Sequence, residues 1–232
     1  MIYTFDDSES LAQYAANEIA KSAQLSMAER GRFDLVLAGG KTPNRTYEIL
    51  AEAGSGSRLW ENTHFSWADE RCVPPDDVES NYHSARLCLL DPLKIPPGHI
   101  HRIPAEDADP SEAAERYGTI FPQRPDLLLL GMGDDGHTAS LFPGSPALDE
   151  TRRRFVVSQA PVEPRLRITA TPPTIAAART ILVLVCGKNK ADAVRRVFSR
   201  EGDIHETPAR LVRGAIWLVD KSAAKELSGI IR

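Results

Sequence analysis

Four consecutive leucines, Leu127–Leu130, constrain the fold of this chain more than any other feature. Asp126 and Gly131 bound this run. A short apolar run with such abrupt ends is typical of a strand buried on both faces, as strands are in a parallel sheet. The run therefore predicts an α/β protein in which helices cover both faces of the sheet.

The rest of the chain alternates between short apolar runs and helical patterns. This alternation predicts right-handed crossovers and a mainly parallel sheet flanked by helices. Strands are predicted at residues 33–37, 64–67, 126–130, 181–186 and 215–219, with a weaker candidate at 100–103. Helices are predicted at residues 8–28, 43–53, 82–90, 110–120, 190–200 and 221–227. Three irregular stretches, 68–80, 91–99 and 131–154, remain; the first and third have the length of functional loops, and the second is interpreted as a connector.

Composition narrows the class of protein. A chain of 232 residues is long enough for one substantial core, so we expect a single domain over residues 1–232. The net charge of −4 shows no basic excess, which argues against a nucleic-acid partner. No signal-peptide pattern or apolar stretch of membrane-spanning length occurs, so we expect a cytoplasmic protein that does not bind membranes. Cys72, Cys88 and Cys186 lack C-x-x-C spacing, so neither disulfides nor a zinc site are expected.

The segment GMGDDGHTASLFPG, residues 131–144, follows the leucine run directly. Ligands of parallel sheets bind outside the carboxyl ends of the strands, so this segment lies where chemistry is expected. Its glycines allow sharp bends and close approach to a ligand, and Asp135 can orient His137 as a general base. The alternative is a histidine that is merely hydrogen-bonded to its neighbours.

The same segment also matches G-x-G-x-x-G, the fingerprint of dinucleotide sites. In that fingerprint the glycines open a helix whose N-terminus receives a pyrophosphate. Here Asp134 and Asp135 would face that anion, and Pro143 and Pro146 interrupt a helix soon afterwards. A dinucleotide cofactor is therefore disfavoured.

Two further segments follow predicted strands. Gly39, Gly40, Lys41 and Thr42 form a glycine turn before Pro43, which suits the first position of a helix, so the free N–H groups there can cradle a phosphate. An ordinary turn with a surface lysine is the alternative. After the next strand come Asp69, Glu70 and Arg71. Without further information an exposed charged turn would be the simpler interpretation of those three residues.

Four segments of the chain resemble the 6-phosphogluconolactonases. They are VLAGGKTPNRTYEIL (36–50), FSWADERCVPPDDVESNYHSAR (65–86), DLLLLGMGDDGHTASLFPG (126–144) and PRLRITATPPTIAAARTILVLVCGKNKA (164–191). They run in the family's order across nearly the whole chain. The resemblance implies the α/β fold shared with sugar-phosphate isomerases, hydrolysis of 6-phospho-D-glucono-1,5-lactone, and no cofactor or metal.

The resemblance also implies roles for particular residues. Arg167 and Lys190 align with residues that bind the sugar phosphate, and Arg71 aligns with the arginine that lines the lactonase pocket. Asp69 is expected to contact the substrate. Lys41 stands where the lactonase pattern usually has a small hydroxyl residue. Neighbouring cations, namely Arg165, Lys188 and residues 152–154, are interpreted as solvated surface charges.

Lactone hydrolysis needs water to attack C1 while the ring oxygen leaves. Neutral His137 could take a proton from that water and return it to the ring oxygen, while Asp135 stabilises the imidazolium. Arg71 could hold the phosphate or stabilise charge on the carbonyl oxygen. No G-x-S-x-G or H-E-x-x-H pattern occurs, so a serine esterase and a metal hydrolase are disfavoured.

Two other functions remain open. Glucosamine-6-phosphate deaminases share the glycine turn and the D-G-H loop but carry a glutamate soon after the histidine, where this chain has TASLFPG. A sugar-phosphate sensor domain of a transcription regulator would need a DNA-reading segment, which this chain lacks. The partner expected is a small sugar-phosphate lactone, and the protein is expected to be a monomer or a small homo-oligomer.

Overall fold

The large sheet of the protein has seven parallel strands in the order β1-β10-β9-β6-β2-β3-β5. The computed structural model describes residues 1–54 and 56–227. The strands of the large sheet are β1 (Ile2–Phe5), β2 (Phe33–Leu37), β3 (Thr63–Trp67), β5 (Ile100–His101), β6 (Leu127–Leu130), β9 (Thr180–Val185) and β10 (Ile216–Asp220). The α/β class predicted from the sequence is therefore confirmed.

Strand β6 lies near the centre of this sheet. It pairs with β2 on one side, Leu35 facing Leu127, and with β9 on the other, Leu130 facing Val183. All four leucines are at most 1% exposed. The leucine run thus forms the buried strand that it predicts.

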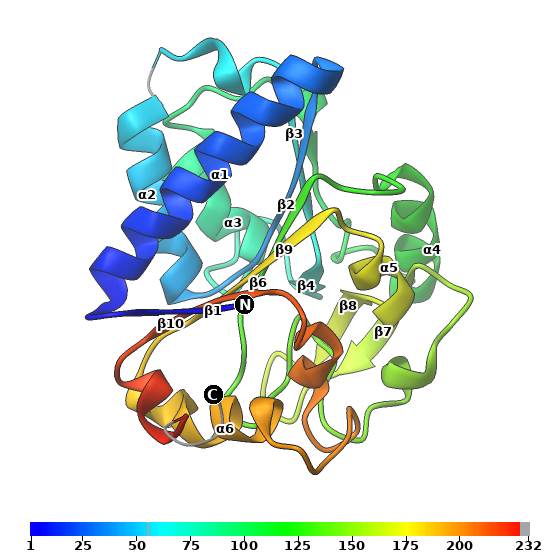
Figure 1. Ribbon diagram of the computed structural model, residues 1–232. Coiled ribbons are helices and arrows are strands. Elements are labelled where there is room, and N and C mark those ends of the chain that lie inside the picture. The colour runs from blue at the N-terminus through cyan, green and yellow to red at the C-terminus, as the bar shows by residue number, and fades with distance from the viewer. Residues whose placement is uncertain (55, 228–232) are drawn as a thin grey trace.

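Helices cover both faces of the large sheet (Figure 1). They are α1 (Ser8–Arg30), α2 (Lys41–Gly54), α3 (Asn81–Ala85), α4 (Pro110–Ile120), α5 (Pro172–Ala176) and α6 (Ala191–Phe198). Figure 1 shows α1, α2 and α3 on one side of the sheet and α4 and α5 on the other. Local signals fix the longest helix, because Asp7 caps its start by accepting from the N–H of Ser10 (2.8 Å) and Gly31, at φ 69°, ends it.

A second sheet of three antiparallel strands, in the order β4-β8-β7, was not predicted. It consists of β4 (Asp69–Arg71), β7 (Phe155–Gln159) and β8 (Leu166–Ala170). The expectation that residues 68–80 are wholly irregular was wrong, because β4 lies within them. Its sequence, Asp-Glu-Arg, has no apolar alternation, and it becomes a strand only through pairing with β8, where Glu70 faces the buried Ile168.

Three other expectations need correction. The helix predicted at 221–227 is only a 3₁₀ turn, Ala223–Glu226, and the helix predicted at 82–90 changes after Ala85 into a π-helical turn, Arg86–Leu90.

Arg154 is not a solvated charge. Its guanidinium is half-buried and donates to the carbonyls of Gly118, Phe121 and Pro122 around the end of α4, where the last carbonyls of the helix have no helical partner.

The strand order reverses direction between β2 and β6. From β2 the chain proceeds to β3 and β5 on one side, and after β6 it proceeds to β9 and β10 on the other. The loops that follow the carboxyl ends of β2 and β6 therefore diverge from each other. Open α/β sheets bind ligands at such a point. No helix among the described residues is long and apolar enough to span a membrane.

Candidate active site

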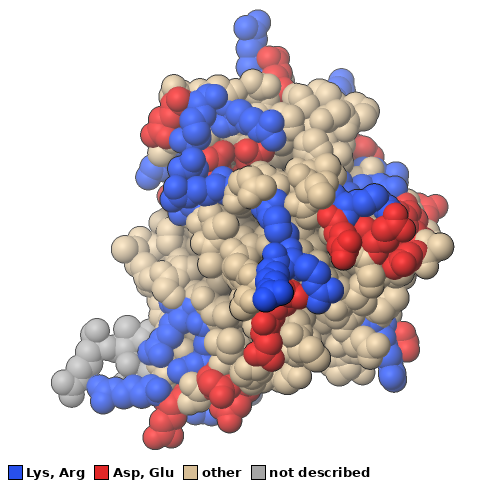
Figure 2. All heavy atoms as spheres, turned by 90° about the vertical axis from the view of Figure 1, so that its right-hand side faces the viewer, with Lys and Arg blue, Asp and Glu red and all other residues tan. Residues whose placement is uncertain are grey.

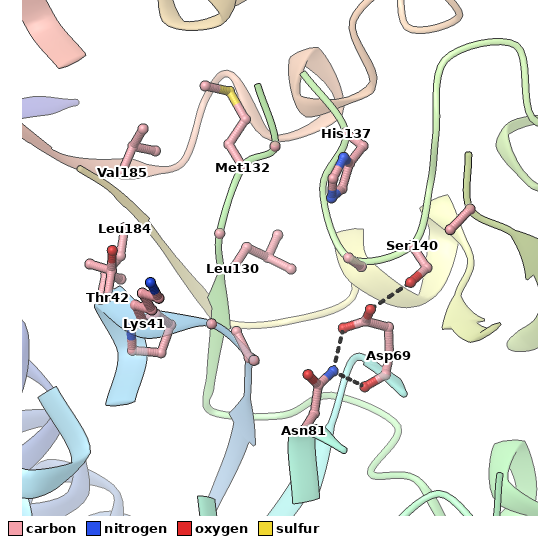
Figure 3. Close-up of a pocket in the computed structure, with 18 of the residues that line it drawn as sticks. Lys41, Thr42, Asp69, Asn81, Leu130, Met132, His137, Ser140, Leu184 and Val185 are labelled. Atoms are coloured by element: carbon pink, nitrogen blue, oxygen red, sulfur yellow. Dashed lines mark hydrogen bonds between the residues drawn. The ribbon is translucent and has the colours of Figure 1, made fainter. Parts of the chain in front are cut away.

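A pocket of about 500 Å³ opens at the carboxyl ends of the strands. The loops that follow β2, β3, β6 and β9 line it, together with residues of the small sheet. Figure 3 shows Lys41 and Thr42 on one side of this pocket and His137 across from them, with Leu130 and Met132 between. The predicted site residues that line it are Gly39, Gly40, Lys41, Thr42, Asp69, Arg71, His137, Arg167 and Lys190. Asp135 lies behind His137 and is not part of the lining.

The loop after β6 folds back on itself to present His137. The N–H of Gly133 donates to the carbonyl of His137 (2.9 Å), and the N–H of Gly136 donates to the carbonyl of Gly133 (3.1 Å). Gly136 has φ 91°, which favours glycine. A Cβ at position 133 would overlap the His137 ring and lie 2.6 Å from Asp135 Oδ1. Gly133 is therefore required by the space that this side-chain pair occupies.

His137 and Asp135 form a hydrogen-bonded pair. Nδ1 of His137 lies 2.6 Å from Asp135 Oδ1, which also accepts from the backbone N–H of His137 at 3.0 Å. Burial acts to raise the pKa of Asp135, but the hydrogen bonds from His137 outweigh burial and lower that pKa. The carboxylate is therefore charged and fixes the proton on Nδ1. This leaves Nε2 of the neutral ring as a proton acceptor.

A pair of arginines forms a cationic wall of the pocket. Arg71 on β4 faces Arg167 on β8 in the antiparallel pairing. The Arg167 residue is only 6% exposed, and its Nε and Nη1 atoms find no hydrogen-bond partner among the described residues. Burial lowers the pKa of Arg167, and the charge of Arg71 adds to the effect, yet a guanidinium keeps its charge in proteins. A buried cation with unused donors is typical of an anion-binding site.

The glycine turn adds backbone N–H groups to the pocket, and Lys41 and Lys190 add cationic groups. Helix α2 begins at Lys41, two residues earlier than predicted, so the turn formed by Gly39 and Gly40 leads directly into its N-terminus. Gly39 packs so closely on Asn81 that a Cβ would overlap the amide of that side chain. Lys190 lies just before α6, faces the pocket, and forms an ion pair with Asp134. On the molecular face in Figure 2, by contrast, basic and acidic side chains occur together in small groups.

Comparison with known proteins identifies the family. The family model for glucosamine-6-phosphate isomerases/6-phosphogluconolactonase matches residues 6–219. The chain belongs to this family. A curated 6-phosphogluconolactonase of Synechocystis sp. is 41% identical over 215 residues, which are 87% of this chain and 88% of the relative. The solved structure of 6-phosphogluconolactonase from Trypanosoma brucei is 28% identical with a TM-score of 0.86 and covers 98% of both chains. A monomeric glucosamine-6-phosphate deaminase, 23% identical with a TM-score of 0.85 over 97% of this chain and 99% of its own, shares the fold.

Asn81 and Ser140 are pocket residues that sequence reasoning missed. Ser140 Oγ donates to Asp69 Oδ2 (2.6 Å), and Asn81 Nδ2 donates to the carbonyl of Asp69 (2.9 Å), as the dashed lines in Figure 3 show. These contacts fix Asp69 in the wall of the pocket. Both residues lie within family segments, but an amide and a hydroxyl without a charged neighbour gave no signal of their own.

Glu70 has a structural role next to the site. Its buried carboxylate accepts from the N–H groups of Arg71, Asn81 and Tyr82 and from Ser80 Oγ, at 2.7 to 3.0 Å. Burial raises its pKa in spite of these hydrogen bonds. Glu70 therefore holds the start of α3 against β4, and it is not available as a catalytic base. Among the described residues no three His, Cys, Asp or Glu side chains gather closely enough to hold a metal ion.

We expect the Gly133→Ala variant to fold but to lose the His137–Asp135 geometry, because the added methyl group overlaps the ring. A displacement of about 1 Å at a catalytic group can reduce turnover roughly 100-fold. Proton NMR should show a downfield Nδ1–H resonance in the wild type that is absent from the variant. Gly214→Ala is the matched control, since Gly214 does not line the pocket and no atom beyond its chain neighbours lies within 4 Å of a Cβ added there among the described residues. Wild-type turnover and an unchanged resonance in Gly133→Ala would contradict this account of the loop.

Proposed function

We propose that this protein hydrolyses 6-phospho-D-glucono-1,5-lactone to 6-phospho-D-gluconate. One observation carries the proposal: a single pocket contains both a proton-accepting His137 and the buried guanidinium of Arg167, whose Nε and Nη1 have no hydrogen-bond partner in the described part of the chain. The first group suits activation of water, and the second suits an anionic substituent of the substrate. Relatives that carry the lactonase name over most of this chain's length support the same substrate.

His137 acts as the general base in this proposal. Its Nε2 atom removes a proton from a water molecule as the water oxygen attacks C1 of the lactone. The proton is then given to the ring oxygen as the C1–O bond breaks, so no covalent intermediate and no cofactor are needed. Asp135 holds the ring and stabilises the imidazolium that forms between these two steps.

The cationic groups bind the phosphate. Arg167 can chelate phosphate oxygens with its unused donors, and Lys190 adds a point charge from the side of α6. The N–H groups of the turn that contains Gly40 and the N-terminus of α2 provide a further anion cradle.

Arg71 places a second guanidinium beside Arg167, and the Arg71→Ala variant separates the two candidate roles of Arg71. A rise in KM assigns Arg71 to the phosphate, and a fall in kcat assigns it to the carbonyl oxygen.

Substitution of His137 tests the assignment of the base. His137→Ala should lower kcat by roughly 10²- to 10⁴-fold, and His137→Asn should lose a similar amount because an amide cannot carry the proton. Asp135→Asn should also lower kcat. Acid release from the phosphorylated lactone, corrected for spontaneous hydrolysis, measures these rates. His205→Ala, which removes an exposed histidine, is the control. A folded His137→Ala protein with near wild-type kcat would refute the assignment.

Substitution of Arg167 tests the phosphate site. Arg167→Ala should weaken substrate binding by about 1 to 3 kcal/mol, seen mainly as a higher KM, because one charged hydrogen-bonding group is lost. The exposed neighbour Arg165, which pairs with Glu163, provides the control variant Arg165→Ala. Unphosphorylated gluconolactone provides the control substrate. Equal kcat/KM for the two lactones in the wild type would show that the pocket does not select for phosphate.

A further inference from the structure

Asp134, the residue directly before Asp135, already engages the phosphate-site lysine. Its Oδ1 atom forms an ion pair with Lys190 Nζ, and both carboxylate oxygens accept from Asn189 Nδ2, at 2.9 and 3.0 Å. The hydrogen bond from Lys190 is the main cause that lowers the pKa of Asp134, and Asn189 contributes in the same direction. The carboxylate is therefore ionised at neutral pH and acts as a resident anion beside the pocket.

The two principal cations of the pocket thus differ in what they contact. Lys190 is paired with a carboxylate, whereas Arg167 has no carboxylate within ion-pair distance among the residues described. Asp134 does not line the pocket, and its side chain is 60% exposed, compared with 21% for Lys190. Lys190 therefore belongs to the pocket lining, and the carboxylate that pairs with it is a more exposed group outside that lining.

The turn that carries Lys190 has a second anchor besides the Asp134–Asn189 hydrogen bonds. The carboxylate of Asp220, at the end of β10, accepts from the N–H of Gly187 through both oxygens (3.1 Å) and from the N–H of Ala223 (2.7 Å). This buried group anchors the backbone just before Lys190. Loss of the Asp134 carboxylate would free the ammonium group without releasing the turn.

We propose that Asp134 limits the affinity of the pocket for phosphate, because its carboxylate competes with the substrate's phosphate for Lys190. The inference rests on the proposed function of the pocket. A phosphate monoester carries nearly two negative charges at pH 7, so it can displace a single carboxylate, whereas a ligand without phosphate leaves the resident pair in place. The pair thereby lowers affinity for the phosphorylated substrate and keeps Lys190 neutralised when no phosphate is present.

The Asp134→Asn variant tests this competition because it removes the charge and keeps the shape of the side chain. KM for the phosphorylated lactone should fall about two- to five-fold at low salt, the range expected from the strength of an exposed ion pair. KM for unphosphorylated gluconolactone should stay unchanged. Inorganic phosphate, titrated calorimetrically, should bind tighter by a similar factor.

Asp192→Asn is the matched control. Asp192 lies two residues after Lys190 and pairs with Arg195 and Arg196, so its removal changes the net charge equally without touching the lysine. If the two variants changed KM and phosphate binding equally, the change would come from the net charge of the protein and not from Lys190. That result would overturn the inference. A higher KM or weaker phosphate binding in Asp134→Asn would show that the carboxylate positions Lys190, and would also overturn it. If the wild type hydrolysed neither lactone, the proposed function would fail, while the phosphate titration would still decide the role of Asp134.

Discussion

The placement of β6 between β2 and β9 is the constraint on which the site depends. Four leucines buried on both faces fix this strand in the middle of the sheet. Because the strand order reverses between β2 and β6, the loop that follows β6 and the glycine turn that follows β2 open onto the same pocket. The core therefore brings together the proposed general base and the proposed anion cradle.

Two consecutive aspartates connect the two ends of the site. Asp135 accepts from His137 and defines which ring nitrogen is free, while Asp134 contacts Lys190 on the neighbouring turn. Both depend on the tight backbone between Gly133 and Gly136. In the proposed function, the loop thus sets both the tautomer of the base and the charge available to the phosphate. Glycine at 133 leaves the space that this arrangement occupies.

The sequence predicted those parts of the fold that local patterns determine. Strands such as β2 and β6 are continuous apolar runs, and their ends could be placed to within a residue. Strand β4 could not be predicted, since Asp-Glu-Arg becomes a strand only by pairing with β8. Arg154 was misjudged for a related reason: its partners are carbonyls more than 30 residues away. Long-range partners of this kind leave no periodic signal in a single sequence.

The sequence also anticipated which residues the fold brings together at the candidate site. Nine of the ten predicted residues line one pocket, and the tenth, Asp135, supports His137 from behind. Asn81 and Ser140, which fix Asp69, were missed because they act through hydrogen bonds that depend on the folded geometry. The ion pair between Asp134 and Lys190 joins residues 56 positions apart and was equally invisible.

A crystal structure with bound 6-phospho-D-gluconate would show directly how the pocket holds its ligand. We expect the phosphate on Arg167 and Lys190, with the C1 carboxylate within hydrogen-bond distance of His137 Nε2. We also expect Lys190 to have exchanged Asp134 for a phosphate oxygen. A product bound in the opposite direction, with its phosphate at His137 and its carboxylate at Arg167, would contradict the account.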